Sequence, residues 1–350
     1  MKKISSAHVL LLVITAFQLV VSLGLSLLLA FVPGFYLPMW LQLLLSPLTM
    51  VIPFAIYCIW TRSNPLTLIR FKKVKPLSIV LAVLVMVFAY PVIILLNLLS
   101  MLFVDNAMAN VLPSVVEMGI IPALLLMAVI PAVMEETIFR GCLYNAYSRV
   151  RPLAGVFLSA LLFGLMHMNF NQMPYAFFLG VIMALMLEAT DSIVIPMIMH
   201  FSLNGFTTVL SFLTMGASQG MAAASSGSTS LTDAISQAYK EVMAQEGLSQ
   251  SMSSAQVDAL VADMVPTMLG VVIGILVVVA LVALIVVLAL IYAAFAINGR
   301  SPKEILLARP QADAYVKGLG GKMRKNRMID IPVIVFIIYA LEECIRSALM

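Results

Sequence analysis

Apolar runs long enough to cross a lipid bilayer recur through this chain of 350 residues, and they restrict its fold more than any other feature. A helix needs roughly 20 apolar residues to cross about 30 Å of hydrocarbon. The residues are 63% hydrophobic and 10% charged, which leaves too little polar surface for a soluble protein of this size. We therefore expect an all-α, polytopic transmembrane helical bundle. Eight spans are predicted at 8–32, 39–60, 77–104, 120–144, 153–169, 173–187, 193–215 and 268–296, with 331–341 as a candidate ninth.

The basic residues are divided unequally between the two sides of this predicted bundle. Loops that stay in the cytoplasm carry an excess of Lys and Arg. If the N-terminus is cytoplasmic, 18 of the 20 basic residues fall in inner segments, and Lys240 is the only one in an outer loop. Glu188 and Asp191, on a short inner turn, run against this trend. We therefore expect a multi-pass protein of a bacterial plasma membrane with a cytoplasmic N-terminus. The basic clusters need no nucleic-acid partner to explain them.

Composition divides the chain into four parts. An outer insert departs from the membrane-like composition of the rest: it opens with a low-complexity Ala/Ser/Gly/Met tract and continues into a short amphipathic helix. Ser253 and Gln256 suggest a capping box for another helix. The insert could serve as a lid or as a partner surface, or it could be an unconstrained insertion. The parts are 1–119 with three spans, 120–215 with four spans, the insert at 216–265, and 266–350 with the last firm span, a basic cytoplasmic loop and a short last helix.

Two adjacent glutamates close the apolar stretch that forms the fourth span. A carboxylate at membrane depth costs at least about 2.5 kcal/mol, so Glu135 and Glu136 indicate a functional site. In a helix, Glu136 and Arg140 share a face, whereas Glu135 lies about 100° away and is free to face something else. One carboxylate could then be stabilised by the cation while the other acts as a general base. The alternative is an ordinary salt bridge at a helix end.

Two of the three histidines lie in the apolar segments that follow these glutamates. Phe163 precedes His167 by four residues, and Asn204 follows His200 by four. His200 and Asn204 therefore share a helix face and are suited to hold a carbonyl oxygen or its developing negative charge. A lone intramembrane histidine is more often a packing residue, and Asn204 could equally form a hydrogen bond between helices. Two histidines together with a glutamate pair favour a site.

These residues resemble three motifs of the CAAX protease and bacteriocin-processing family, also called Abi. Glu135-Glu136-Thr-Ile-Phe-Arg140 is similar to EExxxR, Phe163-Gly-Leu-Met-His167 to FxxxH, and His200-Phe-Ser-Leu-Asn204 to HxxxN. They occur in the family's order and on separate predicted helices. The resemblance covers roughly residues 120–215, under a third of the chain. Any one motif is weak, since Glu342-Glu343 with Arg346 imitates the first with one residue missing.

The resemblance implies an intramembrane endopeptidase that hydrolyses a peptide or protein substrate in or near the membrane. In such a site Glu135 and His167 would hold and activate a water, and His200 and Asn204 would stabilise the oxyanion. Glu136 and Arg140 would hold their helix in place, and Phe163 would be a further supporting residue of the site. A bilayer-embedded cavity supplies the low dielectric in which these polar groups act most strongly. The sequence does not indicate the substrate or an oligomeric state.

A bound metal is the one cofactor that the residue types allow. His167, His200 and Glu135 could form a zinc site of two histidines and a glutamate with an open position for water. Their spacing is not HExxH, and the family has been described both as metalloproteases and as metal-free glutamate proteases. We favour the metal-free interpretation, in which no cofactor is certain and zinc is an alternative.

Two other functional classes use similar residues. A proton- or ion-coupled transporter would use buried Glu and His as a relay, and a non-catalytic immunity or scaffold protein would keep the fold without substrate access.

The expected depths of Glu135 and His167 in the membrane also count against the protease site. In an upright fifth span, His167 lies about 21 Å from the inner end, while Glu135 lies nearer the inner end of its own helix. The site then requires strong tilt, a deeper fourth helix, or a partly re-entrant segment near 171–174.

Overall fold

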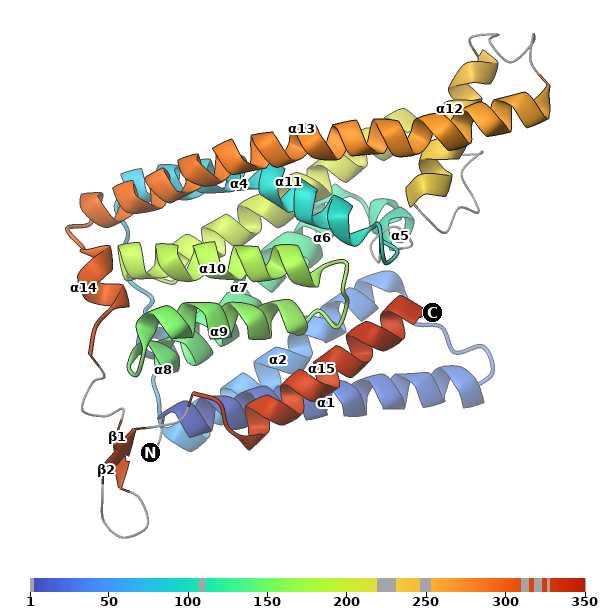
Figure 1. Ribbon diagram of the computed structural model, residues 1–350. Helices are drawn as coiled ribbons and strands as arrows, with labels where there is room; N and C mark the ends of the chain where they lie inside the picture. The colour runs from blue at the N-terminus through green and yellow to red at the C-terminus, as the bar shows by residue number, and fades with distance from the viewer. Residues whose placement is uncertain are drawn as a thin grey trace.

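Long helices lie side by side in this computed structural model, most of them running between the same two ends of the bundle (Figure 1). The structure describes residues 3–106, 111–218, 231–245, 253–309, 315–317, 323–325 and 328–349. Seven helical stretches within these ranges are long and apolar enough to cross a membrane. They are α1 (Lys3–Phe31), α2 (Met39–Thr61), α4 (Pro76–Ser100), the stretch from Ile120 to Ser148, α10 (Met173–Thr190), α11 (Val194–Ser218) and α13 (Ser254–Ile297).

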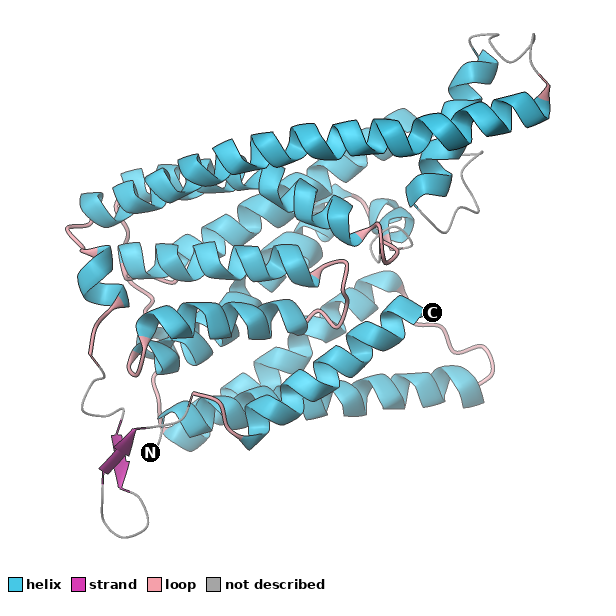
Figure 2. Ribbon diagram, in the orientation of Figure 1, coloured by secondary structure: helices cyan, strands magenta, loops and turns pink. Residues whose placement is uncertain are grey.

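The expected all-α polytopic bundle is confirmed, with two differences at the predicted spans. The fifth span is α9 (Pro152–Leu165), whose 14 residues extend about 21 Å at 1.5 Å per residue, too short to cross alone. The candidate ninth is α15 (Ile331–Leu349), which carries charged residues in its second half. Short helices fill the connections: α3 (Pro65–Leu68), α5 (Leu112–Glu117) and α14 (Pro302–Leu306). The described ranges also hold a two-stranded antiparallel hairpin, β1 (Tyr315–Lys317) and β2 (Met323–Lys325), drawn in magenta in Figure 2.

The predicted outer insert lies partly outside the described residues, including the low-complexity tract. The amphipathic helix is present as α12 (Leu231–Gln245), and Ser253 and Gln256 form the expected capping box at the start of α13. Pro266 does not end that helix, so α13 runs on for 44 residues, about 66 Å. The predicted boundary between insert and last span therefore falls inside one continuous helix.

The helix of the glutamates is continuous through five segments and contains two π-helical stretches. It runs through α6 (Ile120–Leu124), η1 (Leu125–Val129), α7 (Ile130–Glu136), η2 (Thr137–Tyr144) and α8 (Asn145–Ser148). Pro131 has no N–H, so Met127, four residues earlier, lacks its usual α-helical donor at the point where η1 lies. Such π-helical insertions concentrate at functional sites. Glu135 and Glu136 are the 16th and 17th of the 29 residues, at mid-helix.

A close contact between α9 and α10 positions the loop that carries His167. A Cβ on Gly180 would lie 2.7 Å from the Cα and Cβ of Ala160 and 3.3 Å from Nη2 of Arg140, so only glycine fits here without displacement. The loop itself is anchored to α4: Nδ2 of Asn171 donates to Oδ1 of Asn97 at 3.0 Å. Backbone packing on one side and a side-chain hydrogen bond on the other therefore fix the loop.

Charged side chains join several elements at the end of the bundle that we expect to be cytoplasmic. Glu188, at the end of α10, accepts from Arg70 at 2.8 Å and from Arg300 at 3.3 Å. Asp191 pairs with Lys72. Burial lowers the pKa of Arg70, but the charge and hydrogen bond of Glu188, together with smaller contributions from Tyr144 and Asp191, raise it above its ordinary value overall. Glu188 and Asp191, which ran against the charge pattern, are thus the partners of the basic residues around them.

Candidate active site

The structure brings at least one residue of each of the three motifs to one cavity of about 180 Å³ within the bundle. Glu135, Phe163, His167, His200 and Asn204 all line it, from α7, α9, the α9–α10 loop and α11. The expected difficulty with depth does not arise. The helix of Glu135 extends to Ser148 rather than ending near 144, which places the carboxylate at mid-helix, and the short α9 ends just before His167.

Glu136 and Arg140 form the buried pair that their spacing predicts. Nη1 of Arg140 donates to Oε1 of Glu136 at 3.0 Å, and neither side chain is exposed. The guanidinium carbon of Arg140 also lies 4.3 Å from the centre of the Phe163 ring, a cation–π contact that offsets part of its desolvation. Oε2 of Glu136 and both Nε and Nη2 of Arg140 have no hydrogen-bond partner among the described residues. One hydrogen bond therefore joins Glu136 to Arg140, and the Phe163 ring contacts the guanidinium.

His200 contacts both glutamates, which the sequence analysis did not predict. Nδ1 of His200 lies 3.0 Å from Oε1 of Glu136, and Nε2 lies 3.9 Å from Oε2 of Glu135. An ionised carboxylate can only accept, so Nδ1 carries the proton of the first contact. Glu136 thereby fixes the ring of His200 and directs Nε2 toward Glu135. The two carboxylates have separate positions: Glu136 is fully buried, whereas the Glu135 side chain is 21% exposed.

His167 is oriented by the backbone of its own helix. Its Nδ1 lies 2.9 Å from the carbonyl oxygen of Phe163, and since a carbonyl only accepts, Nδ1 is the donor. This leaves Nε2 with a free lone pair for a bound water or substrate. The Phe163 ring stands edge-on to His167 and His200, with ring centres 5.1 and 6.0 Å apart. Phe163 thus contacts three of the motif side chains: Arg140 and both histidines.

Asn204 forms the hydrogen bond between helices that was the alternative to an oxyanion role. Its Nδ2 donates to the carbonyl oxygen of Met127 at 2.9 Å. Met127 is the residue whose regular helical donor is missing because of Pro131, so Asn204 compensates for the interrupted helix. An amide nitrogen has two N–H groups, and the second is not used in this contact. Sequence spacing could not reveal this bond, because it joins two helices 77 residues apart.

Several cavity residues were missed by reasoning from the motifs. Gln172, Tyr175, Thr207 and Thr208 add polar groups to the lining. A signal existed for each of them, since all four are polar residues within or beside apolar spans. They widen the site beyond the three motifs and give a bound substrate more hydrogen-bonding groups.

The candidate zinc ligands of the alternative interpretation, His167, His200 and Glu135, are not placed as a metal site in this arrangement. Among the residues that the structure describes, no group of three His, Cys, Asp or Glu side chains is placed to hold a metal ion. We therefore assign no step of the chemistry to a metal.

Comparison with known proteins identifies the same stretch of helices. Residues 117–206 match the family model described as type II CAAX prenyl endopeptidase Rce1-like. These residues are similar to the Rce1-like family. The chain is also 34% identical over 88 residues to the membrane-embedded CAAX protease MroQ of Staphylococcus aureus (strain USA300). That match covers 23% of this chain and 36% of the relative, so the chain spans about a third of the relative's length. No solved structure matches. The predicted resemblance over roughly 120–215 is thus confirmed for the Rce1-like segment.

Proposed function

We propose that this chain is an intramembrane endopeptidase that uses Glu135 to activate water against a peptide bond of a membrane-associated substrate. The observation that carries the proposal is the convergence of Glu135, His167 and His200 on one cavity, with a separate hydrogen bond orienting each histidine. The match of residues 117–206 to the Rce1-like family supports the same chemistry.

In this proposal Glu135 and His167 activate the water. The Glu135 carboxylate and the free Nε2 of His167 face the same cavity, where a water can donate one hydrogen bond to each of them. Glu135 takes the proton as the water oxygen attacks the carbonyl carbon, and it later delivers the proton to the leaving amine. Because Glu135 is only partly exposed and is not paired with Arg140, its carboxylate is available for this transfer.

In this proposal His200 and Asn204 stabilise the oxyanion. His200 can donate from Nε2 when both ring nitrogens are protonated, and the Glu136 carboxylate on Nδ1 stabilises that cationic form. Asn204 supplies its second amide N–H while the first remains on Met127. Removing one such donor typically lowers turnover by about 10²–10³-fold. Glu136, Arg140 and Phe163 act as positioning residues in this scheme.

The proposed substrate is a peptide or protein segment in or near the membrane, and the proposed location is a bacterial plasma membrane. A suitable reporter has one apolar transmembrane helix followed by a randomised uncharged segment of ten residues. Purified protein in lipid nanodiscs is incubated with the reporter pool, and mass spectrometry identifies the released peptides.

We expect Glu135→Gln to slow cleavage by about 10²–10⁴-fold, because the amide cannot take the proton from water. Glu342→Gln is the matched control, since Glu342 is the first glutamate of the similar but exposed C-terminal motif and should leave the rate unchanged. A chelator should also leave it unchanged. Cleavage that persists in Glu135→Gln would overturn the assigned role, and activity lost with chelator and restored by zinc would show a metal enzyme.

A further inference from the structure

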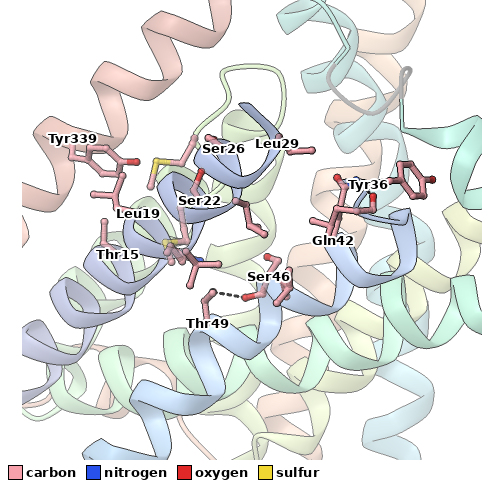
Figure 3. Close-up of a pocket in the computed structure, with 17 residues that line it drawn as sticks. Thr15, Leu19, Ser22, Ser26, Leu29, Tyr36, Gln42, Ser46, Thr49 and Tyr339 are labelled. Carbon is pink, nitrogen blue, oxygen red and sulfur yellow. Dashed lines mark hydrogen bonds between the residues drawn. The ribbon is translucent and has the colours of Figure 1, made fainter. Parts of the chain in front are cut away.

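A second, larger cavity of about 570 Å³ lies between α1 and α2, and most of its lining falls outside the Rce1-like segment (Figure 3). Tyr339 of α15 borders it at one end, near Thr15 and Leu19. Tyr36 and Gln42, at the connection between α1 and α2, lie at the other. Its size is within the range of sites that bind ligands of several hundred daltons.

The lining of this cavity mixes polar and apolar side chains and carries no charge. On α1 the polar residues repeat every three or four positions, which places them on one helix face opposite polar residues of α2. None of the lining residues is Lys, Arg, Asp or Glu, so the cavity does not suit a lipid phosphate or a metal ion. The polar residues in the two helices are Thr15, Gln18, Ser22 and Ser26 on α1, and Gln42, Ser46 and Thr49 on α2.

The α1 side chains in this lining offer unused hydrogen-bonding groups. Thr15 donates to Leu11 within its own helix, but no hydrogen bond involves the side chains of Gln18, Ser22 or Ser26 among the described residues. Hydrocarbon cannot satisfy such groups, and each unsatisfied one is costly in a bilayer. The cavity therefore suits water or a ligand that both donates and accepts hydrogen bonds along its length.

This cavity reaches the loop that carries His167. Met166 and Met168 both line it, while His167 between them lines the cavity of Glu135. The loop thus separates the two cavities, and its methionine side chains are flexible and adaptable in shape. Met168 has a positive φ of 54°, a conformation that reverses the chain direction beside His167.

We propose that the α1–α2 cavity binds an extended, uncharged segment of the polypeptide substrate next to the bond that is cleaved. An extended backbone presents one N–H donor and one carbonyl acceptor per residue, which the hydroxyl and amide groups of the lining can pair, while the apolar part of the lining suits uncharged side chains. The proposal rests on the proposed endopeptidase function, because it is the position beside His167 that makes this segment part of the substrate.

Photo-cross-linking tests binding without relying on catalysis. p-Benzoylphenylalanine is placed at Ser22 in the Glu135→Gln protein, which is then incubated with the reporter pool in nanodiscs and irradiated. Leu23 is the matched control, since it is adjacent on the same helix, is 62% exposed and does not line the cavity. We expect peptide adducts from Ser22, at sites within the uncharged segment, and few from Leu23. Adducts with phospholipid alone, equal adducts from both positions, or no adduct from Ser22 would each overturn the proposal.

Filling the cavity gives a kinetic test in the active protein. Ser22→Phe with Ser26→Phe should raise KM for the reporter about tenfold with kcat nearly unchanged, equivalent to losing about 1.4 kcal/mol of binding. Leu23→Phe with Leu27→Phe is the control, since both residues are exposed and neither lines the cavity. An unchanged KM would overturn the binding site while leaving the endopeptidase intact. Cleavage that persists in Glu135→Gln, with adducts still formed from Ser22, would instead overturn the catalytic assignment and leave the binding site.

Discussion

At the scale of single residues, the two adjacent glutamates have different proposed roles because their side chains have different surroundings. Glu136 is fully buried and bonded to Arg140 and His200, whereas Glu135 faces the cavity at a distance from the guanidinium. A buried pair is strongly destabilised when only one partner is removed, because an uncompensated charge remains. The stability of this helix and its chemistry can therefore be tested separately.

We expect Arg140→Met to lower the free energy of unfolding by about 3–5 kcal/mol, because Glu136 loses its cationic partner within the bundle. The double variant Glu136→Gln with Arg140→Met should regain much of this stability, since a neutral amide can still accept from His200. It should not regain cleavage, because the carboxylate that stabilises cationic His200 is gone. Thermal unfolding in detergent and cleavage of the reporter measure the two effects.

The exposed C-terminal pair provides the control for this experiment. Arg346 and Glu342 have the same spacing and a similar distance of 3.0 Å, but their side chains are more than half exposed. Arg346→Met should therefore change the free energy of unfolding by less than about 1 kcal/mol. Equal losses in Arg140→Met and Arg346→Met would contradict the importance of burial at the first pair.

At the scale of helices, the site depends on how closely α9 approaches α10. Gly180→Ala places a methyl group where Ala160 and Arg140 already lie, so the helices must separate. Overpacking of this kind costs about 1–3 kcal/mol. We expect a lower unfolding temperature together with reduced cleavage, because α9 carries Phe163 and leads directly to His167.

Gly24→Ala is the control for that substitution, since a Cβ on Gly24 of α1 would meet nothing within 4 Å. It should leave the unfolding temperature unchanged or raise it slightly, because alanine favours a helix by about 1 kcal/mol over glycine. A Gly180→Ala protein as stable and active as the Gly24→Ala protein would show that the α9–α10 contact does not position the site.

The helices were predictable from the apolar runs, but the contacts between their side chains were only partly predictable. Spacing within one helix predicts that Glu136 pairs with Arg140, and the structure agrees. Spacing cannot predict that His200 bonds to Glu136, since that contact depends on how two helices pack. The depth of Glu135 was misjudged for a related reason: the polar residues after Tyr144 suggested the end of a span, whereas the helix continues to Ser148.

At the scale of the whole molecule, the ionisable residues of the spanning helices do not form a path across the bundle. The helices α2 and α4 hold no Asp, Glu, His, Lys or Arg, and α1 contributes only His8 beyond its first residue. The glutamates and His200 form one local cluster, while the other large cluster, around Glu188, lies at one end. A proton relay would need further groups between the two faces, so the arrangement favours local chemistry over coupled transport.

The orientation of the bundle is a prediction that belongs to this scale. The N-terminus, α14 and the β1–β2 hairpin lie at one end of the molecule, and the α1–α2 connection lies at the other (Figure 1). Arg70, Lys72 and Arg300 lie at the first end, and cytoplasmic loops favour such basic residues.

Single-cysteine labelling tests this orientation directly. With Cys58, Cys142 and Cys344 replaced by alanine, a cysteine in place of Tyr36 should react with a membrane-impermeant maleimide on intact cells, because Tyr36 is exposed on the α1–α2 connection. A cysteine in place of Ser301, just before α14, should react only after the membrane is permeabilised. The reverse labelling pattern would show that the N-terminus lies outside the cytoplasm. It would also place the mouth of the α1–α2 cavity near Tyr36 on the cytoplasmic side, so that the bound substrate segment would have to enter from the cytoplasm.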